Sequence, residues 1–179
     1  MKRTTFVCAL FALAFAFGTA QAQPTAGAQP KLAHADRKFI DNAVQGGMFE
    51  VQVSQLAASK ATDPQVKSFA GMLLDQHTAA NNDLVKIANA KGVELPAVPG
   101  HGKRRAIDRL GQRQGADFDE HFVREVGIKD HEKNIEMFQK AGKNVKDADL
   151  RAFIDKTLPS LRDHLALAQK LPQAGKKSS

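Results

Sequence analysis

The stretch Phe69-Ala70-Gly71-Met72-Leu73-Leu74-Asp75-Gln76-His77 lies at the centre of the most regular apolar pattern in this 179-residue chain. Apolar residues recur through and around it at helical spacing, at Val66, Phe69, Leu73, Ala80, Leu84 and Ile87. This spacing predicts an amphipathic helix whose apolar face is turned to a core. His77 falls inside the same row. Because burying a polar group unpaired costs about 1–3 kcal/mol, His77 needs a partner within the core.

The composition favours an all-α protein. The chain has no Trp and no Tyr, and it contains many residues that suit helices better than strands. Its formal charge of +7 suggests loose attraction to anionic envelope surfaces, with simple solubility as an equally good explanation, and it does not indicate nucleic-acid binding.

The first residues predict export. Lys2 and Arg3 precede an apolar run from Phe6 to Phe17, and Ala20-Gln21-Ala22 has the small-x-small pattern of a cleavage site. We therefore expect residues 1–22 to be a signal peptide, cleaved after Ala22, and the mature protein to lie in a bacterial periplasm. Cys8, the single cysteine, would leave with it, so neither disulfides nor thiolate metal ligands are expected. No later stretch is apolar enough to span a membrane.

Helix signals divide the rest of the chain. We expect a disordered spacer at 23–34, a helical-bundle domain at 35–172 and a basic flexible tail at 173–179. The expected long helices cover about 36–60, 62–91, 118–142 and 147–171, with a short helical piece at 106–113. The predicted N-terminal caps are Asp36, Asp63 (followed by Pro64), Asp117 and Asp147. Gly92 should end the second long helix, and Pro159 should kink the last one.

Short connections join the first two and the last two long helices, and a longer one lies between these pairs. This pattern predicts an antiparallel four-helix bundle. If both short turns lie at the same end, a rise of about 1.5 Å per residue places Glu50, His77 and His131 within roughly 5 Å of one level. His164 then lies deeper, close to the level of Glu125.

This coincidence of depth has two interpretations. Glu50, His77, His131 and His164, with Glu125 as a further possibility, can bind a divalent metal, because imidazole and carboxylate together suit zinc, iron, copper or manganese. Alternatively, the same residues form a satisfied hydrogen-bond cluster without metal. A ferritin-type di-iron site would require Glu-x-x-His, which is absent from the sequence. No phosphate-binding loop or nucleophile motif indicates another enzyme class.

The residues resemble a bacterial exported family known as domain of unknown function 4142, which is placed among ferritin-like four-helix bundles. The resemblance rests on Phe39, Glu50, Leu56-Ala57, Val66, Phe69-Ala70, His77, Leu84 and Ala88, and then on His131, Phe138, Leu158-Pro159 and His164. The family often has Asp directly before the histidine of the second helix, where this chain has Gln76. The resemblance implies the ferritin-like fold and brings no established activity.

We therefore expect a non-enzymatic binding or envelope-stress protein whose functional site is the Glu/His cluster. Two alternatives remain: a metal-dependent oxidoreductase or metal-binding protein using the same residues, and a purely structural or interaction protein in which the cluster is only part of the core.

Overall fold

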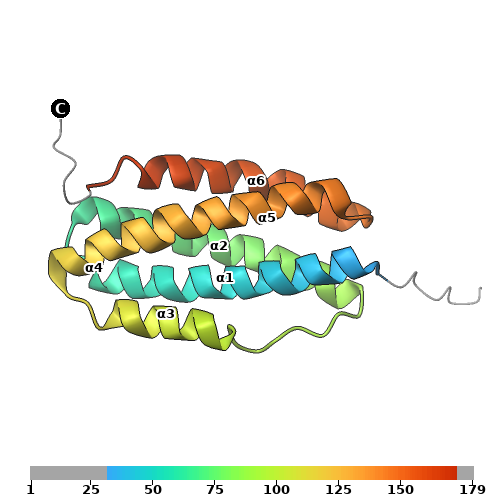
Figure 1. The fold of residues 1–179 in the computed structure, drawn as a ribbon, viewed down its shortest axis with the longest axis horizontal. Helices are drawn as coiled ribbons and strands as arrows, with labels where there is room; N and C mark the ends of the chain where they lie inside the picture. The colour runs from blue at the N-terminus through green and yellow to red at the C-terminus, as the bar shows by residue number, and fades with distance from the viewer. Residues whose placement is uncertain (1–31, 173–179) are drawn as a thin grey trace, which may run out of the picture.

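The computed structural model describes residues 32–172, in which the chain forms helices and no strands (Figure 1). One helix of the bundle is continuous but changes its winding, and α3 lies outside the bundle beside α1. The elements are α1 (His34–Lys60), α2 (Pro64–Ala90), α3 (His101–Gly111), α4 (Gly115–His121), η1 (Phe122–Asp130), α5 (His131–Asn144) and α6 (Ala148–Ala168). The predicted antiparallel, ferritin-like four-helix bundle is confirmed. The expected signal peptide 1–22, the spacer up to residue 31 and the tail 173–179 lie outside the described residues.

Two of the predicted caps and the predicted stop are confirmed. The side chain of Asp63 accepts hydrogen bonds from the backbone N–H groups at the start of α2, and Asp147 does the same for α6. Gly92 follows α2 with φ +64°, a conformation that favours glycine. α6 continues through Pro159 and ends at Ala168, short of the expected 171.

The other two predicted caps are wrong. α1 begins at His34, before Asp36, whose buried carboxylate instead accepts a hydrogen bond of 2.8 Å from the backbone N–H of Lys146. α4 begins at Gly115, before Asp117, so the latter lies within the first turn. Both acids lie past the helix start, and Asp36 holds a distant turn in place.

The two short turns lie at opposite ends of the bundle, contrary to the arrangement assumed from sequence (Figure 1). At one end, Asp119 of α4 accepts hydrogen bonds from the backbone N–H groups of Thr62 and Asp63, which connect α1 to α2. At the other end, Lys91 forms an ion pair of 2.8 Å with Asp147. α2 and α5 therefore run in the same direction, and the connection containing α3 carries the chain back along the bundle.

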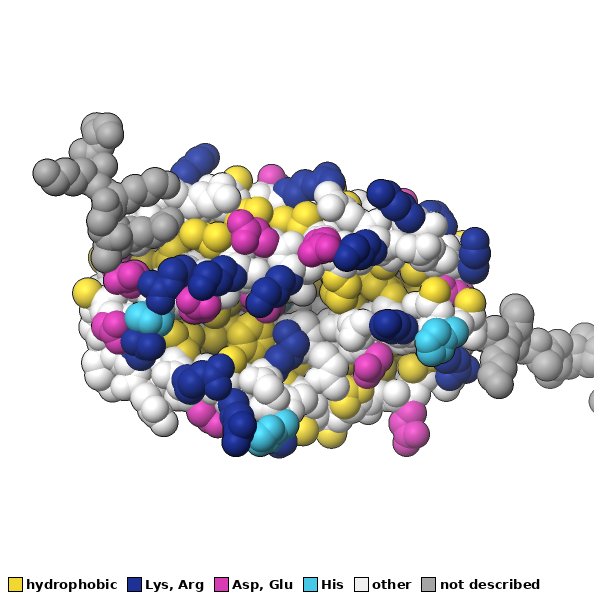
Figure 2. All heavy atoms as spheres, in the orientation of Figure 1, with side chains coloured by type: hydrophobic (Ala, Val, Ile, Leu, Met, Phe, Trp, Pro, Cys, Tyr) yellow, Lys and Arg dark blue, Asp and Glu magenta, His cyan; other side chains and the backbone are white. Residues whose placement is uncertain are grey.

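The core consists of two apolar clusters with a polar layer between them. One is built around Phe49, Phe69, Phe118 and Phe122, and the other around Phe39, Phe138 and Phe153. Between them lie four buried polar residues, one from each bundle helix: Glu50, His77, His131 and His164. α1 also buries Ser54, one turn from Glu50. None of the helices within residues 32–172 is both long and apolar enough to span a membrane. Figure 2 shows Lys and Arg side chains over the visible face, which carries α3, α4 and α5.

Candidate metal centre

Three buried histidine rings converge in the polar layer. They come from α2 (His77), α5 (His131) and α6 (His164). The Nε2 atom of His131 lies 3.4 Å from Nε2 of His77 and 3.2 Å from Nδ1 of His164. One nitrogen from each ring thus belongs to a set whose members all lie within 4.8 Å of one another. The structure brings together all three histidines that the sequence singled out.

Hydrogen bonds on the far side of two rings determine which nitrogens face inward unprotonated. His131 donates from Nδ1 to the carbonyl oxygen of Val126 at 3.0 Å, and His164 donates from Nε2 to Oε1 of Gln76 at 2.9 Å. A carbonyl oxygen can only accept, so each of these ring nitrogens carries the proton. In a neutral imidazole the other nitrogen then has a lone pair. His131 and His164 therefore point two lone pairs at each other.

The surroundings keep these rings uncharged. Burial lowers the pKa of His164 to about 4. It also lowers the pKa of His131, and it lowers that of His77 well below the ordinary value, with the two neighbouring histidines as smaller causes. At neutral pH all three imidazoles are consequently in the form that binds metal ions.

Two of the three separations between the nitrogens fit a tetrahedral metal ion, and the third, between His77 and His164, lies within 4.8 Å. With Zn–N bonds of about 2.0–2.1 Å, two ligands of a tetrahedron lie about 3.3 Å apart. The two measured separations from His131, 3.4 Å and 3.2 Å, match this value. Backing of a ligating histidine by a carbonyl or carboxylate is typical of metal sites, and both Val126 and Gln76 supply such an oxygen.

Glu50 is placed behind the cluster. Its Oε1 lies 3.8 Å from Nδ1 of His131, the nitrogen on the side away from the converging lone pairs. The carboxyl group is fully buried, and neither oxygen has a hydrogen-bond partner among the described residues. Burial, and secondarily the neighbouring Asp130 carboxylate, raises the pKa of Glu50 well above its ordinary value. The predicted ligand Glu50 thus lies behind His131, and its raised pKa favours the neutral carboxyl group unless a cation is bound nearby.

A small cavity of about 30 Å³ adjoins Glu50 and His77. Gly46 and Gly47 line it on α1, and the buried Oδ1 of Asn81 on α2 also has no partner among the described residues. A Cβ atom at Gly47 would lie 2.6 Å from that oxygen. The absence of a side chain at Gly47 therefore permits the close approach of α2. Gly46, where a Cβ would lie 3.5 Å from Oδ1 of Asn134 on α5, borders the same cavity beside Glu50.

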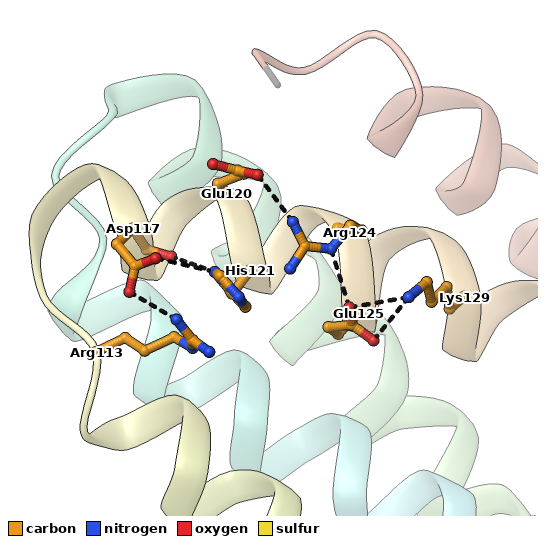
Figure 3. Close-up of polar contacts among 7 residues, drawn as sticks. All are labelled: Arg113, Asp117, Glu120, His121, Arg124, Glu125 and Lys129. Atoms are coloured by element: carbon orange, nitrogen blue, oxygen red, sulfur yellow. Dashed lines mark hydrogen bonds and ion pairs between the residues drawn. The ribbon is translucent and has the colours of Figure 1, made fainter. Parts of the chain in front are cut away.

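Glu125 lies outside the centre, which corrects its inclusion as a possible ligand. Its side chain is 47% exposed and pairs with Arg124 and Lys129 at 3.0 Å each (Figure 3). His121, which precedes η1 on the same continuous helix, contacts Asp117. Glu125 was expected to face inward because its position was counted with α-helical spacing. η1 is a π-helix, in which i→i+5 bonds place more residues in each turn than an α-helix does. The inward row therefore contains Val126, Phe122 and Phe118.

Two features of η1 bear on the site. The Nδ1–H group of His131 donates a hydrogen bond to the carbonyl oxygen of Val126. In an α-helix this oxygen would accept a backbone hydrogen bond. Gly127 then lies so close to its neighbours that a Cβ would be 2.9 Å from Cβ of Ala168 and 3.2 Å from the ring of Phe69. The π-helical winding and the close packing at Gly127 together place His131 within the cluster.

Sequence reasoning missed the roles of Gln76 and of the Val126 carbonyl. One sequence signal did point to Gln76: the family often has Asp directly before the histidine of the second helix, and this chain has Gln there. Its partner, however, is a histidine 88 positions further along the chain, which local spacing does not reveal. The backbone carbonyl carries no sequence signal.

The fold and the site define this protein as a four-helix bundle with a buried three-histidine centre. The profile of a family described only as a domain of unknown function (DUF4142) matches residues 21–171, and the chain belongs to this family. No curated protein matches the sequence.

Among solved structures, the bundle is similar to a DUF305 fragment from Deinococcus radiodurans, with a TM-score of 0.68 and 10% identity over 78% of this chain and 96% of that one. It is also similar to a conserved hypothetical protein from Mycobacterium tuberculosis, with a TM-score of 0.60 and 16% identity over 76% and 96% of the two chains. At these identities the similarity establishes the fold alone.

Proposed function

We propose that this protein is an exported metal-binding protein whose site consists of His77, His131 and His164. The observation that carries the proposal is the 3.2 Å approach of two unprotonated ring nitrogens, on His131 and His164. A proton between the two nitrogens requires one tautomer to change and an outer hydrogen bond to break. Nε2–H of His77, 3.4 Å from Nε2 of His131, can satisfy the lone pair of His131 but leaves that of His164. A metal ion satisfies both lone pairs while the bonds to Val126 and Gln76 remain.

The donor set favours particular metals among the four expected from sequence. Three neutral imidazoles suit zinc, copper and iron better than manganese, which prefers oxygen ligands. A tetrahedral arrangement with three histidines leaves one position for a ligand from outside the set. A buried dication also requires negative charge nearby, and Glu50 behind His131 can supply it. We therefore propose Zn²⁺ or Cu²⁺ as the preferred ion.

A binding role, as opposed to catalysis, agrees with the burial of the site. The three ring nitrogens lie within the core, and the adjoining cavity of about 30 Å³ is of the size that holds water and not an organic substrate. The predicted signal peptide supports action in the periplasm. There, such a protein would hold metal ions, a role consistent with the expected function in envelope stress.

The first test is the metal content of the protein purified from the periplasm without affinity tag or chelator, followed by calorimetric titration with Zn²⁺ and Cu²⁺. We expect about one ion per chain, and no high-affinity ion in His77→Ala/His131→Ala. The matched control His34→Ala/His101→Ala removes two exposed histidines outside the centre and should bind normally. Absence of metal, with no thermal shift on adding zinc, copper, iron or manganese, would contradict the proposal. Equal binding by both double variants would contradict it as well.

A further inference from the structure

A groove separates α3 from the helix formed by α4, η1 and α5. We call it the α3 groove, and its volume is about 430 Å³. Its lining is of two kinds, apolar at the base and charged along the edges. The apolar residues are Phe49, Val53, Ala106, Leu110 and Val126, and the polar ones are Arg109, Arg113, His121, Arg124, Glu125, Asp130 and Lys133. In Figure 2, hydrophobic side chains show between Lys and Arg side chains in this part of the surface.

Ion pairs hold two of the cations along the groove in fixed positions. Arg113 binds Asp117 at 2.8 Å, and Arg124 binds Glu120 at 2.8 Å and Glu125 at 3.0 Å (Figure 3). Their charge is therefore largely compensated within the protein. These ion pairs fix the positions of Arg113 and Arg124 along one wall of the groove.

Two other cations remain available for a ligand. Arg109 on α3 and Lys133 on α5 both line the groove, and neither has a carboxylate partner among residues 32–172. They belong to the two elements that border it. A guanidinium and an ammonium group that share a groove without partners favour an anionic group between them.

The base of the groove is apolar and buried. Phe49 and Val53 of α1 lie beneath it, and Leu110 of α3 closes one side; each is less than a tenth exposed. Lys103 lies over the Phe49 ring, with Nζ 4.6 Å from the ring centroid. Pockets of about 300–1,000 Å³ are typical of small-molecule sites. The α3 groove falls in this range of volume, with an apolar base and a mostly polar rim.

We propose that the α3 groove binds a small amphiphilic carboxylate, with its aliphatic part against Phe49, Val53 and Leu110 and its charged group between Arg109 and Lys133. The lining has more cations than anions, which disfavours a metal cation there. Along the outer edge, however, Asp117, Glu120 and Glu125 alternate with the basic residues. This alternation disfavours a flat anionic membrane surface relative to a ligand that enters the groove.

Decanoate is the probe, added at concentrations well below those at which it forms micelles and measured by isothermal calorimetry. Acetate lacks the aliphatic part and decan-1-ol lacks the charge, so both should bind at least tenfold more weakly. Arg109→Ala/Lys133→Ala should weaken decanoate binding at least tenfold. The matched control Lys38→Ala/Lys67→Ala removes two exposed lysines on α1 and α2 and should leave it unchanged.

Several outcomes would overturn the proposal: no binding of decanoate, equal affinity in all variants, or equal weakening in both double variants, which would indicate only long-range attraction. Binding to anionic phospholipid vesicles without binding of free decanoate would point to a membrane surface instead. His77→Ala/His131→Ala should bind decanoate as the unmodified protein does, so the groove and the metal centre are tested separately.

Discussion

The Nε2 atom of His131 and the Nδ1 atom of His164 face each other at 3.2 Å while the second nitrogen of each ring donates a hydrogen bond elsewhere. Two lone pairs in contact within a buried site are unfavourable unless a cation lies between them. This arrangement predicts that the centre contributes little to the stability of the metal-free protein and much to that of the loaded one.

Replacing His164 by Phe should test this balance. The change removes one buried polar ring at similar volume, and we expect the metal-free free energy of unfolding to change by less than about 1.5 kcal/mol. Stabilisation by metal, about 2.7 kcal/mol at one hundred times the dissociation constant, should be lost. Urea unfolding followed by circular dichroism measures both, since the chain has no Trp or Tyr for fluorescence. A large loss of stability without metal would instead indicate a structural hydrogen-bond cluster.

Gln76 should act on the metal through His164. Its Oε1 accepts the Nε2 proton at 2.9 Å and so keeps Nδ1 unprotonated. Loss of such an outer partner typically costs about 10–100-fold in metal affinity. We expect Gln76→Ala to weaken Zn²⁺ binding by this factor in calorimetric titrations, and Gln76→Glu to restore it because a carboxylate also accepts the proton. The control is Gln52→Ala, which removes an exposed glutamine on a different helix, α1. If Gln76→Ala binds normally, Gln76 does not orient the ring.

Acid should destabilise the metal-free protein. An imidazole whose pKa is lowered in the fold contributes stability above its ordinary value of 6.5, and that stability is lost as the pH falls towards the folded pKa, about 4 for His164. His77 and His131 shift in the same direction. We expect the urea midpoint to fall progressively between pH 6.5 and pH 4.

Glu50 acts in the opposite sense. Its pKa is raised above 4.5 in the fold, so its contribution is present at low pH and is lost as the pH rises through the folded value. Glu50→Gln should therefore make the acid loss steeper. A midpoint that stays constant or rises on acidification would contradict the assignment of neutral, buried histidines.

The sequence was sufficient to predict the bundle and its histidine layer, because both follow from local periodicity. His77 and His131 lie near the middle of their helices, so their depth is nearly the same whichever end is used for counting. For this reason His77 and His131 were placed at one level although the short turns lie at opposite ends. His164, which was placed deeper and close to Glu125, in fact lies 3.2 Å from His131. A residue near a helix end would have been misplaced by the same assumption.

The ligand set was less predictable, because it depends on winding and on distant contacts. Glu125 was placed inward by an α-helical count, and the π-helical winding of η1 turns Val126 inward instead. Glu50 is at the expected depth but behind the ring of His131. Which side of a ring a neighbour occupies depends on the rotation of two helices, and periodicity does not specify this.

Gly127 should be essential for the packing of η1 against α2 and α6. A Cβ at this position would lie 2.9 Å from Cβ of Ala168, and both atoms belong to helices that cannot easily separate. We expect Gly127→Ala to lower the free energy of unfolding by about 1–3 kcal/mol, the usual cost of overpacking. It should also weaken metal binding, because η1 carries the Val126 carbonyl that orients His131.

A double-mutant cycle separates this contact from the general effect of alanine on η1. Ala168→Gly removes the opposing Cβ and should cost up to about 1 kcal/mol alone, from helix propensity. In Gly127→Ala/Ala168→Gly, the two changes should be less destabilising together than their sum, with a coupling of at least about 0.5 kcal/mol. The remaining loss would reflect the contact with Phe69, 3.2 Å from the added Cβ. Strict additivity in urea unfolding would mean that the approach of η1 to α6 does not limit this position.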